Sequence, residues 1–67
     1  MKAKVYLKKN PKRYVREHKY LWRLKLDIDY GEIEILKIKE YWTDGLHEEF
    51  KEYEYNMHDV DHILIEN

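Results

Sequence analysis

Residues 20–28 read Tyr-Leu-Trp-Arg-Leu-Lys-Leu-Asp-Ile, and this stretch decides the fold class. Large apolar residues occupy every second position, and most positions between them carry charged side chains, which is typical of a strand with one buried face. The segment Asp29-Tyr30-Gly31 follows directly and indicates a hairpin turn in which Gly31 takes a positive φ. The stretch therefore predicts one strand of an antiparallel sheet that ends in a hairpin.

Apolar residues continue to alternate after this turn, but their phase changes at Ile35-Leu36. Ile33 and Ile35 occupy one parity, whereas Leu36 and Ile38 occupy the other. A β-bulge would absorb such a change and would bend a long strand across a curled sheet. We therefore predict a bulge at this point.

Residues 46–58 have two interpretations. As a helix, their apolar side chains recur at spacings of three and four, with acidic residues opposite. As a strand, the Tyr-rich segment alternates and suits a pleated surface. Asp44-Gly45 just before it is typical of a type I′ hairpin turn, and Asn56 and Asp59 indicate a short turn before a last strand. We favour a strand over residues 46–55 and keep the helix over 46–58 as the alternative.

The predicted fold is mostly β: a single domain over residues 1–67, folded as a small five-stranded antiparallel curled sheet or SH3-like barrel. The element order resembles that of SH3-like small barrels, in which one helical turn introduces the last strand, and the resemblance concerns element order alone. Asn10-Pro11 indicates a basic loop or one helical turn after the first strand. The expected strands cover residues 3–8, 19–29, 32–43, 46–55 and 62–66. The expected core contains Val5, Leu7, Trp22, Leu24, Leu26, Ile28, Ile33, Ile38, Ile63 and Ile65.

Composition limits the class of protein. The chain has 67 residues, 40% of them charged, and no cysteine, so its core must stabilise it without disulfide bonds. No apolar run approaches the roughly 20 residues that a membrane span needs. The first residues lack the apolar region of a signal peptide, so we expect a cytoplasmic protein. A Lys-, Ile- and Tyr-rich chain without Ser or Gln favours a low-GC bacterium, its phage or a plasmid as the source, and a hyperthermophile is the alternative.

Catalytic chemistry has little support in the sequence. There is no Ser or Cys nucleophile, and both glycines lie in predicted turns rather than in a phosphate-binding loop. His58 and His62 stand four residues apart, with Asp59 and Asp61 beside them, and could share a metal ion on a helix. We interpret this cluster as a polar turn. We therefore expect no enzyme activity, no cofactor and no metal.

Charge is divided between the two halves of the chain. Ten of the thirteen Lys and Arg residues lie in residues 1–26, whereas thirteen of the fourteen Asp and Glu residues lie in residues 27–67. Such an asymmetry favours a nucleic-acid partner, or a partner that itself binds nucleic acid. The alternative is that strands of opposite charge pair, so that neighbours neutralise one another on a solvated face.

We interpret the acidic half as the binding surface. Carboxylates along a rigid element, with tyrosines between them, can imitate the charge of a nucleic-acid backbone. We therefore predict a small non-enzymatic inhibitor that occupies a basic nucleic-acid-binding site of a protein partner, as a DNA mimic directed at a nuclease, restriction or CRISPR system would. The predicted partner-binding residues are Glu48, Glu49, Glu52, Tyr53, Glu54, Tyr55, Asp59 and Asp61.

Two other functions stay open. One is a small barrel that binds nucleic acid directly through its basic N-terminal loop, where an aromatic residue lies among cations. The other is a structural subunit whose oppositely charged halves assemble head to tail into a homo-oligomer. Trp22 and Trp42 could stack on bases, but we assign both to the core. The residues of the basic site would be Lys8, Lys9, Lys12, Arg13, Tyr14 and Arg16.

Overall fold

The computed structural model describes residues 1–19 and 23–66. Its strands are β1 (Lys2–Leu7), β2 (Asn10–Lys19), β3 (Arg23–Tyr30), β4 (Glu34–Thr43), β5 (Glu48–Asn56) and β6 (Val60–Glu66), with a 3-10 helix η1 (Met57–Asp59) before β6. The mostly β prediction is confirmed. These residues contain no α-helix, so the alternative helix over 46–58 is wrong. Nor does the described part of the chain hold a helix long and apolar enough to cross a bilayer.

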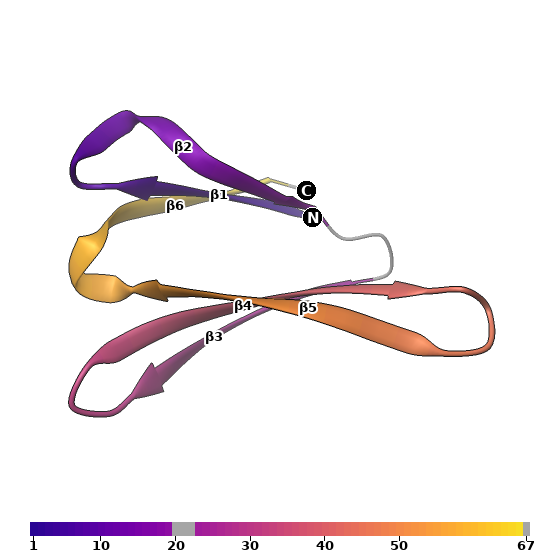
Figure 1. The fold of residues 1–67 in the computed structure, drawn as a ribbon. Helices are drawn as coiled ribbons and strands as arrows, with labels where there is room; N and C mark the ends of the chain where they lie inside the picture. The colour runs from indigo at the N-terminus through magenta and orange to yellow at the C-terminus, as the bar shows by residue number, and fades with distance from the viewer. Residues whose placement is uncertain (20–22, 67) are drawn as a thin grey trace.

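The strands form two three-stranded antiparallel sheets that lie one above the other (Figure 1). Sheet A has the order β2-β1-β6, and sheet B has the order β3-β4-β5. No strand ladder joins the two sheets within the described residues. The architecture is therefore an open two-layer arrangement with six described strands, and the five-stranded sheet and the closed barrel are not formed.

Residues 10–19 form a strand where the sequence predicted a basic loop or a helical turn. Pairing between β1 and β2 is regular from Lys2 to Val5, and the register then shifts on either side of Tyr6. Pro11 lies between Asn10 and Tyr14, within the second of these register shifts. The N–H that proline lacks is therefore not missing from a regular ladder. The prediction was wrong because an irregular strand end, rather than a loop, accommodates the proline.

The bulge predicted at Ile35-Leu36 is also absent. The register of β4 against both β3 and β5 is continuous through this segment. The apparent phase change arises because Ile33 lies in the loop before β4 and is 59% exposed. The buried face of β4 begins only with Leu36 and continues with Ile38.

Both hairpin loops of sheet B are longer than predicted. The first covers residues 31–33, and Gly31 has no positive φ, since among the described residues only Gly45 has one. The second covers residues 44–47, where the Asp44 carboxylate accepts hydrogen bonds from two backbone N–H groups of the loop, each at 2.8 Å. These bonds lower the pKa of Asp44 and take the place of a two-residue turn.

The predicted turn before the last strand is confirmed as η1. Its N-cap is Asn56, whose side-chain oxygen accepts a hydrogen bond from the His58 N–H at 2.9 Å. The Lys8 N–H donates to the carbonyl oxygen of Asp59 at 2.9 Å. This second bond ties η1 to the end of β1.

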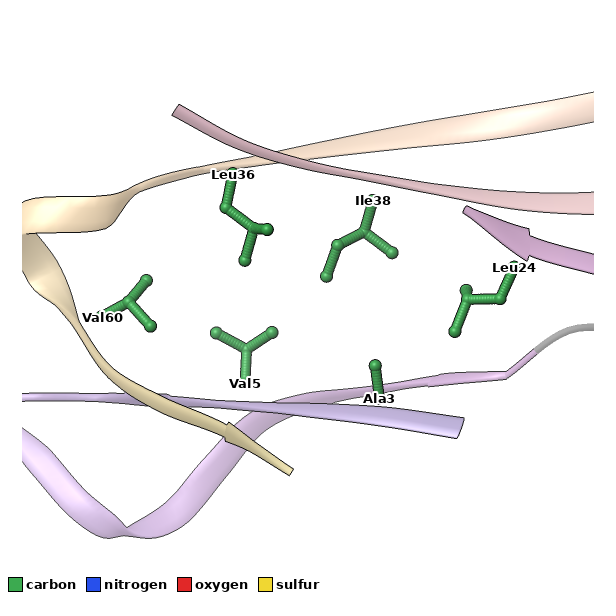
Figure 2. Packing of buried hydrophobic residues seen from close by; sticks show 6 residues of the cluster. All are labelled: Ala3, Val5, Leu24, Leu36, Ile38 and Val60. Carbon is green, nitrogen blue, oxygen red and sulfur yellow. The ribbon is translucent and has the colours of Figure 1, made fainter. Parts of the chain in front are cut away.

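The core lies between the two sheets, and side chains from both sheets point into it (Figure 2). Most of the core side chains come from the central strands β1 and β4, because a central strand is flanked by another strand on each side. The buried apolar cluster consists of Ala3, Val5, Leu24, Leu36, Ile38 and Val60.

The predicted core is confirmed in part. Ile33 and Ile65 are 59% and 53% exposed, so their assignment was wrong. Trp42 is only half-buried. Trp22 lies outside the described residues. Val5, Leu24 and Ile38 are buried as predicted, and four more of the predicted core residues pack partly buried against the core: Leu7, Leu26, Ile28 and Ile63.

Candidate functional site

A buried histidine joins the two sheets. His18 of β2 is fully buried, with Nδ1 2.7 Å from Oε2 of Glu40 on β4 and Nε2 2.7 Å from the hydroxyl of Tyr55 on β5. A carboxylate can only accept, so Nδ1 donates to Glu40; in the neutral imidazole, Nε2 then accepts from the Tyr55 hydroxyl. Burial lowers the pKa of His18, against the opposing effect of Glu40, and burial also raises the pKa of Tyr55. Burial therefore favours the neutral imidazole of His18, and both of its ring nitrogens have a hydrogen-bond partner.

Three predicted site residues take part in this contact between the sheets: Arg16, Tyr53 and Tyr55. The Nε of Arg16 lies 3.4 Å from Oε2 of Glu40, and its guanidinium lies 4.3 Å from the centre of the Tyr53 ring. The Tyr53 ring packs against the His18 ring with centroids 4.9 Å apart. Tyr53 and Tyr55 are thus half-buried between the sheets, and Arg16 is turned toward sheet B.

We expect Tyr55→Phe to lower the free energy of unfolding by about 1–3 kcal/mol, because Nε2 of His18 would stay buried without a donor. Urea unfolding measures the loss. Tyr53→Phe is the matched control, since the Tyr53 hydroxyl makes no side-chain hydrogen bond within the described residues. Equal losses in the two variants would show that the bond to His18 is unimportant.

Stability should also depend on pH through His18. Its pKa is lower in the folded chain than in the unfolded chain, where it is about 6.5. As the pH falls below about 6.5, the unfolded state binds the proton first, so stability is complete above this pH and declines below it. The His18→Gln variant should lack the part of this loss of stability that comes from protonation of His18. Thermal midpoints of both proteins between neutral and mildly acidic pH test this, and parallel curves would refute it.

The outward face of sheet A carries a row of aromatic rings. Ala3 and Val5 point into the core, so the alternate residue Tyr6 points outward. The register places Tyr14 of β2 and His62 of β6 on either side of it. The rings of Tyr6 and His62 stack with centroids 4.2 Å apart, and the ring of Tyr14 meets Tyr6 edge-on at 6.1 Å. We call Tyr14, Tyr6 and His62 the aromatic row.

Cations border the aromatic row. Nζ of Lys4 lies 5.2 Å from the centre of the Tyr14 ring and 3.0 Å from a carboxylate oxygen of Glu66, so its charge is partly balanced. Four other cations occupy the β1–β2 turn and the irregular end of β2; they are exposed and form no salt bridge within the described residues. We call these four the basic hairpin end: Lys8, Lys9, Lys12 and Arg13.

The predicted basic site is therefore largely brought together. Tyr14 and the basic hairpin end lie at one end of sheet A, whereas Arg16 turns away to Glu40. The sequence did not reveal Tyr6 and His62 as members of this site. Strand parity gives Tyr6 an outward position, but its neighbours depend on the pairing of β1 with the last strand.

The predicted acidic surface is divided among several elements. On β5, alternation and the register against Ile38 and Leu36 direct Tyr53 and Tyr55 toward sheet A, and Glu49 shares their face. Asp59 lies in η1, and Asp61 lies in β6, where its carboxylate is 2.6 Å from Nδ1 of His62. The outward face of β5 carries Glu48, Phe50, Glu52 and Glu54.

Cations of sheet B offset part of the acidic charge. Glu48 forms a salt bridge with Arg23 at 3.0 Å. On β4, Lys39 stands opposite Glu52 in the register, and Lys37 stands opposite Glu54. The outward face of sheet B is therefore mixed in charge, as expected where strands of opposite charge pair.

The two histidines of the possible metal cluster lie in different elements. His58 belongs to η1, and His62 belongs to β6, where it stacks on Tyr6. Within residues 1–19 and 23–66, no group of three or more His, Cys, Asp or Glu side chains is arranged to hold a metal ion.

Comparisons with protein-family models, with curated proteins and with solved structures found no match. The functional inference therefore depends on the geometry of these side chains.

Proposed function

We propose that this protein binds single-stranded nucleic acid on the outward face of sheet A. The observation that carries the proposal is the aromatic row, in which the exposed Tyr14 and His62 flank the half-buried Tyr6 on three adjacent strands, beside the basic hairpin end. Unpaired bases stack on exposed aromatic rings, while Lys and Arg contact the phosphates. Both kinds of contact meet on this one face.

The arrangement favours single strands over duplexes. Bases in a duplex stack on one another and offer no free face to a protein ring, whereas unpaired bases do. Stacking and phosphate contacts read no base edges, so we expect weak sequence preference. The activity needs no catalytic group.

Tyr14→Ala should lower the affinity for a single strand by roughly 10- to 100-fold, the effect of losing one base-stacking ring. Fluorescence anisotropy with labelled oligothymidylate, single-stranded RNA and duplex DNA at low salt measures it. Phe50→Ala is the matched control, because Phe50 is 50% exposed, close to the 48% of Tyr14, but lies on sheet B. Equal effects of the two variants, or no binding by the unaltered protein, would exclude the proposal.

The outward face of β5 supports a second proposal, in which the protein occupies the basic nucleic-acid-binding site of a protein partner. The observation that favours it is that Glu52 and Glu54 form no salt bridge within the described residues and share a face with the half-exposed Phe50. Opposite charge on such a partner would accelerate association. Failure to bind any oligonucleotide, together with partner binding that Glu52→Lys/Glu54→Lys abolishes, would favour this function over the first.

A further inference from the structure

The strand β3 has a free edge and a self-complementary sequence. It pairs with β4 on one side and with no other strand within the described residues. Its apolar residues Leu24, Leu26 and Ile28 face the core side of sheet B, and its charged residues alternate with them on the outward face. Along that face two cations are followed by two anions: Arg23, Lys25, Asp27 and Asp29.

We propose that two copies of this protein pair through β3, antiparallel and with two-fold symmetry about Leu26. In this register Lys25 faces Asp27 of the second copy, and Arg23 faces Asp29 of the second copy. The symmetry repeats both pairs, so every charged side chain of β3 meets an opposite charge. The same register places Leu24 against Ile28 on the inner face.

Neighbouring registers and other edges are less suitable. Centring the pair on Lys25 would set Lys25 against itself, and centring it on Asp27 would set Asp27 against itself; like charges directly opposite are destabilising. The edge of β2 is mainly basic and has an irregular ladder. The edge of β5 would place glutamates opposite glutamates. The edge of β6 carries Asp61 and Glu66 but no lysine or arginine to meet them. Charge complementarity thus selects β3 and selects one register.

Lys25 lacks a balancing charge within the part of the single chain that the structure describes. It stands opposite Lys39 in the register with β4, and neither Lys25 nor Asp27 forms a salt bridge within the described residues. Asp27 of a second copy would lie on the free side of Lys25 and relieve this repulsion. The Asp27 carboxylate accepts a hydrogen bond from the Ile28 N–H at 2.9 Å, which pairing would exchange for contacts with the second copy.

An apolar groove beside β3 supports the same pairing. It has a volume of about 330 Å³ and lies between β3 and β6, where Ile63 contributes to its wall with Leu26 and Ile28. Tyr30 at its end is 74% exposed. A two-fold axis perpendicular to sheet B brings the β6 edges of the two copies toward each other, which shields the groove from solvent. Sheet A of each copy stays on the same side of the pair, so its outward face remains free.

Sedimentation velocity across micromolar to millimolar concentrations tests the pairing. The unaltered protein should pass from monomer to dimer as concentration rises. Lys25→Asp and Asp27→Lys should each raise the dissociation constant by roughly tenfold or more, because each turns two attractive pairs into repulsive ones. An equimolar mixture of the two variants restores opposite charges at both positions and should form dimers again. Circular dichroism confirms that each variant is folded.

Three results would overturn the pairing. The first is that the unaltered protein stays monomeric at every concentration. The second is that the single variants dimerise as well as the unaltered protein. The third is that the mixture of the two variants stays monomeric. The test does not involve nucleic acid, so its failure would leave the function proposed for sheet A unaffected.

Discussion

Ile38→Ala should lower the free energy of unfolding by about 2–5 kcal/mol. Ile38 lies on the central strand of sheet B, is fully buried, and packs with Val5 and Leu24 in the single apolar cluster of the described residues. A domain of this size has a total stability of only about 3–10 kcal/mol. The substitution should therefore remove a large share of that stability, and urea unfolding followed by circular dichroism measures it.

Ile33→Ala is the matched control, because the same residue type is shortened and the sequence pattern assigned both isoleucines to the core. Ile33 is 59% exposed in the loop before β4, so its loss should change stability by no more than about 0.5 kcal/mol. Comparable losses at the two positions would mean that the strand boundary and the inward face of β4 are misplaced.

Lys12→Gln/Arg13→Gln should reduce binding to a single-stranded oligonucleotide most strongly at low salt. Each cation that contacts a phosphate contributes about 0.7 to the slope of log affinity against log salt concentration for single strands, so the slope should fall by about 1.4. Both residues are exposed at the irregular end of β2, and neither forms a salt bridge within the described residues, so the fold should be unaffected.

Lys37→Gln/Lys39→Gln removes the same charge from the outward face of sheet B and serves as the control. It should leave the salt slope unchanged. If both double variants reduced the slope equally, net charge rather than the basic hairpin end would determine binding.

Much of the fold is encoded in local patterns. The alternation over residues 20–28 predicted the strand observed as β3, and the turn residues predicted the hairpins of sheet B and the turn observed as η1. In each case the signal lies within a few adjacent residues, because strand parity and turn chemistry are local properties.

The strand β2 was missed because its evidence is distant in the sequence. Its buried residue is His18, which looks like a surface residue until Glu40 and Tyr55, 22 and 37 residues away, satisfy its two nitrogens. Its pairing with β1 is irregular around Pro11, so no clean alternation marks it. A polar buried face and an irregular register together remove the usual strand signal.

Only part of the candidate site could be predicted from the sequence, because some of its residues are adjacent in the sequence and others are brought together only by strand pairing. The cations near Tyr14 are neighbours in the sequence and could be recognised as a cluster. Tyr6 and His62 become neighbours only through the pairing of the first strand with the last. Arg16 belongs to the same basic segment, but its ion pair with Glu40, 24 residues away, draws it toward the other sheet.

The most direct test of the central claim is nuclear magnetic resonance of the labelled protein as an oligothymidylate is added. The binding face proposed here predicts shifts of backbone signals along the aromatic row (Tyr14, Tyr6 and His62) and in residues 8–13, with the β5 signals from Phe50 to Glu54 unchanged. Shifts concentrated on β5, or no shifts at low salt, would contradict the claim that the outward face of sheet A binds single-stranded nucleic acid.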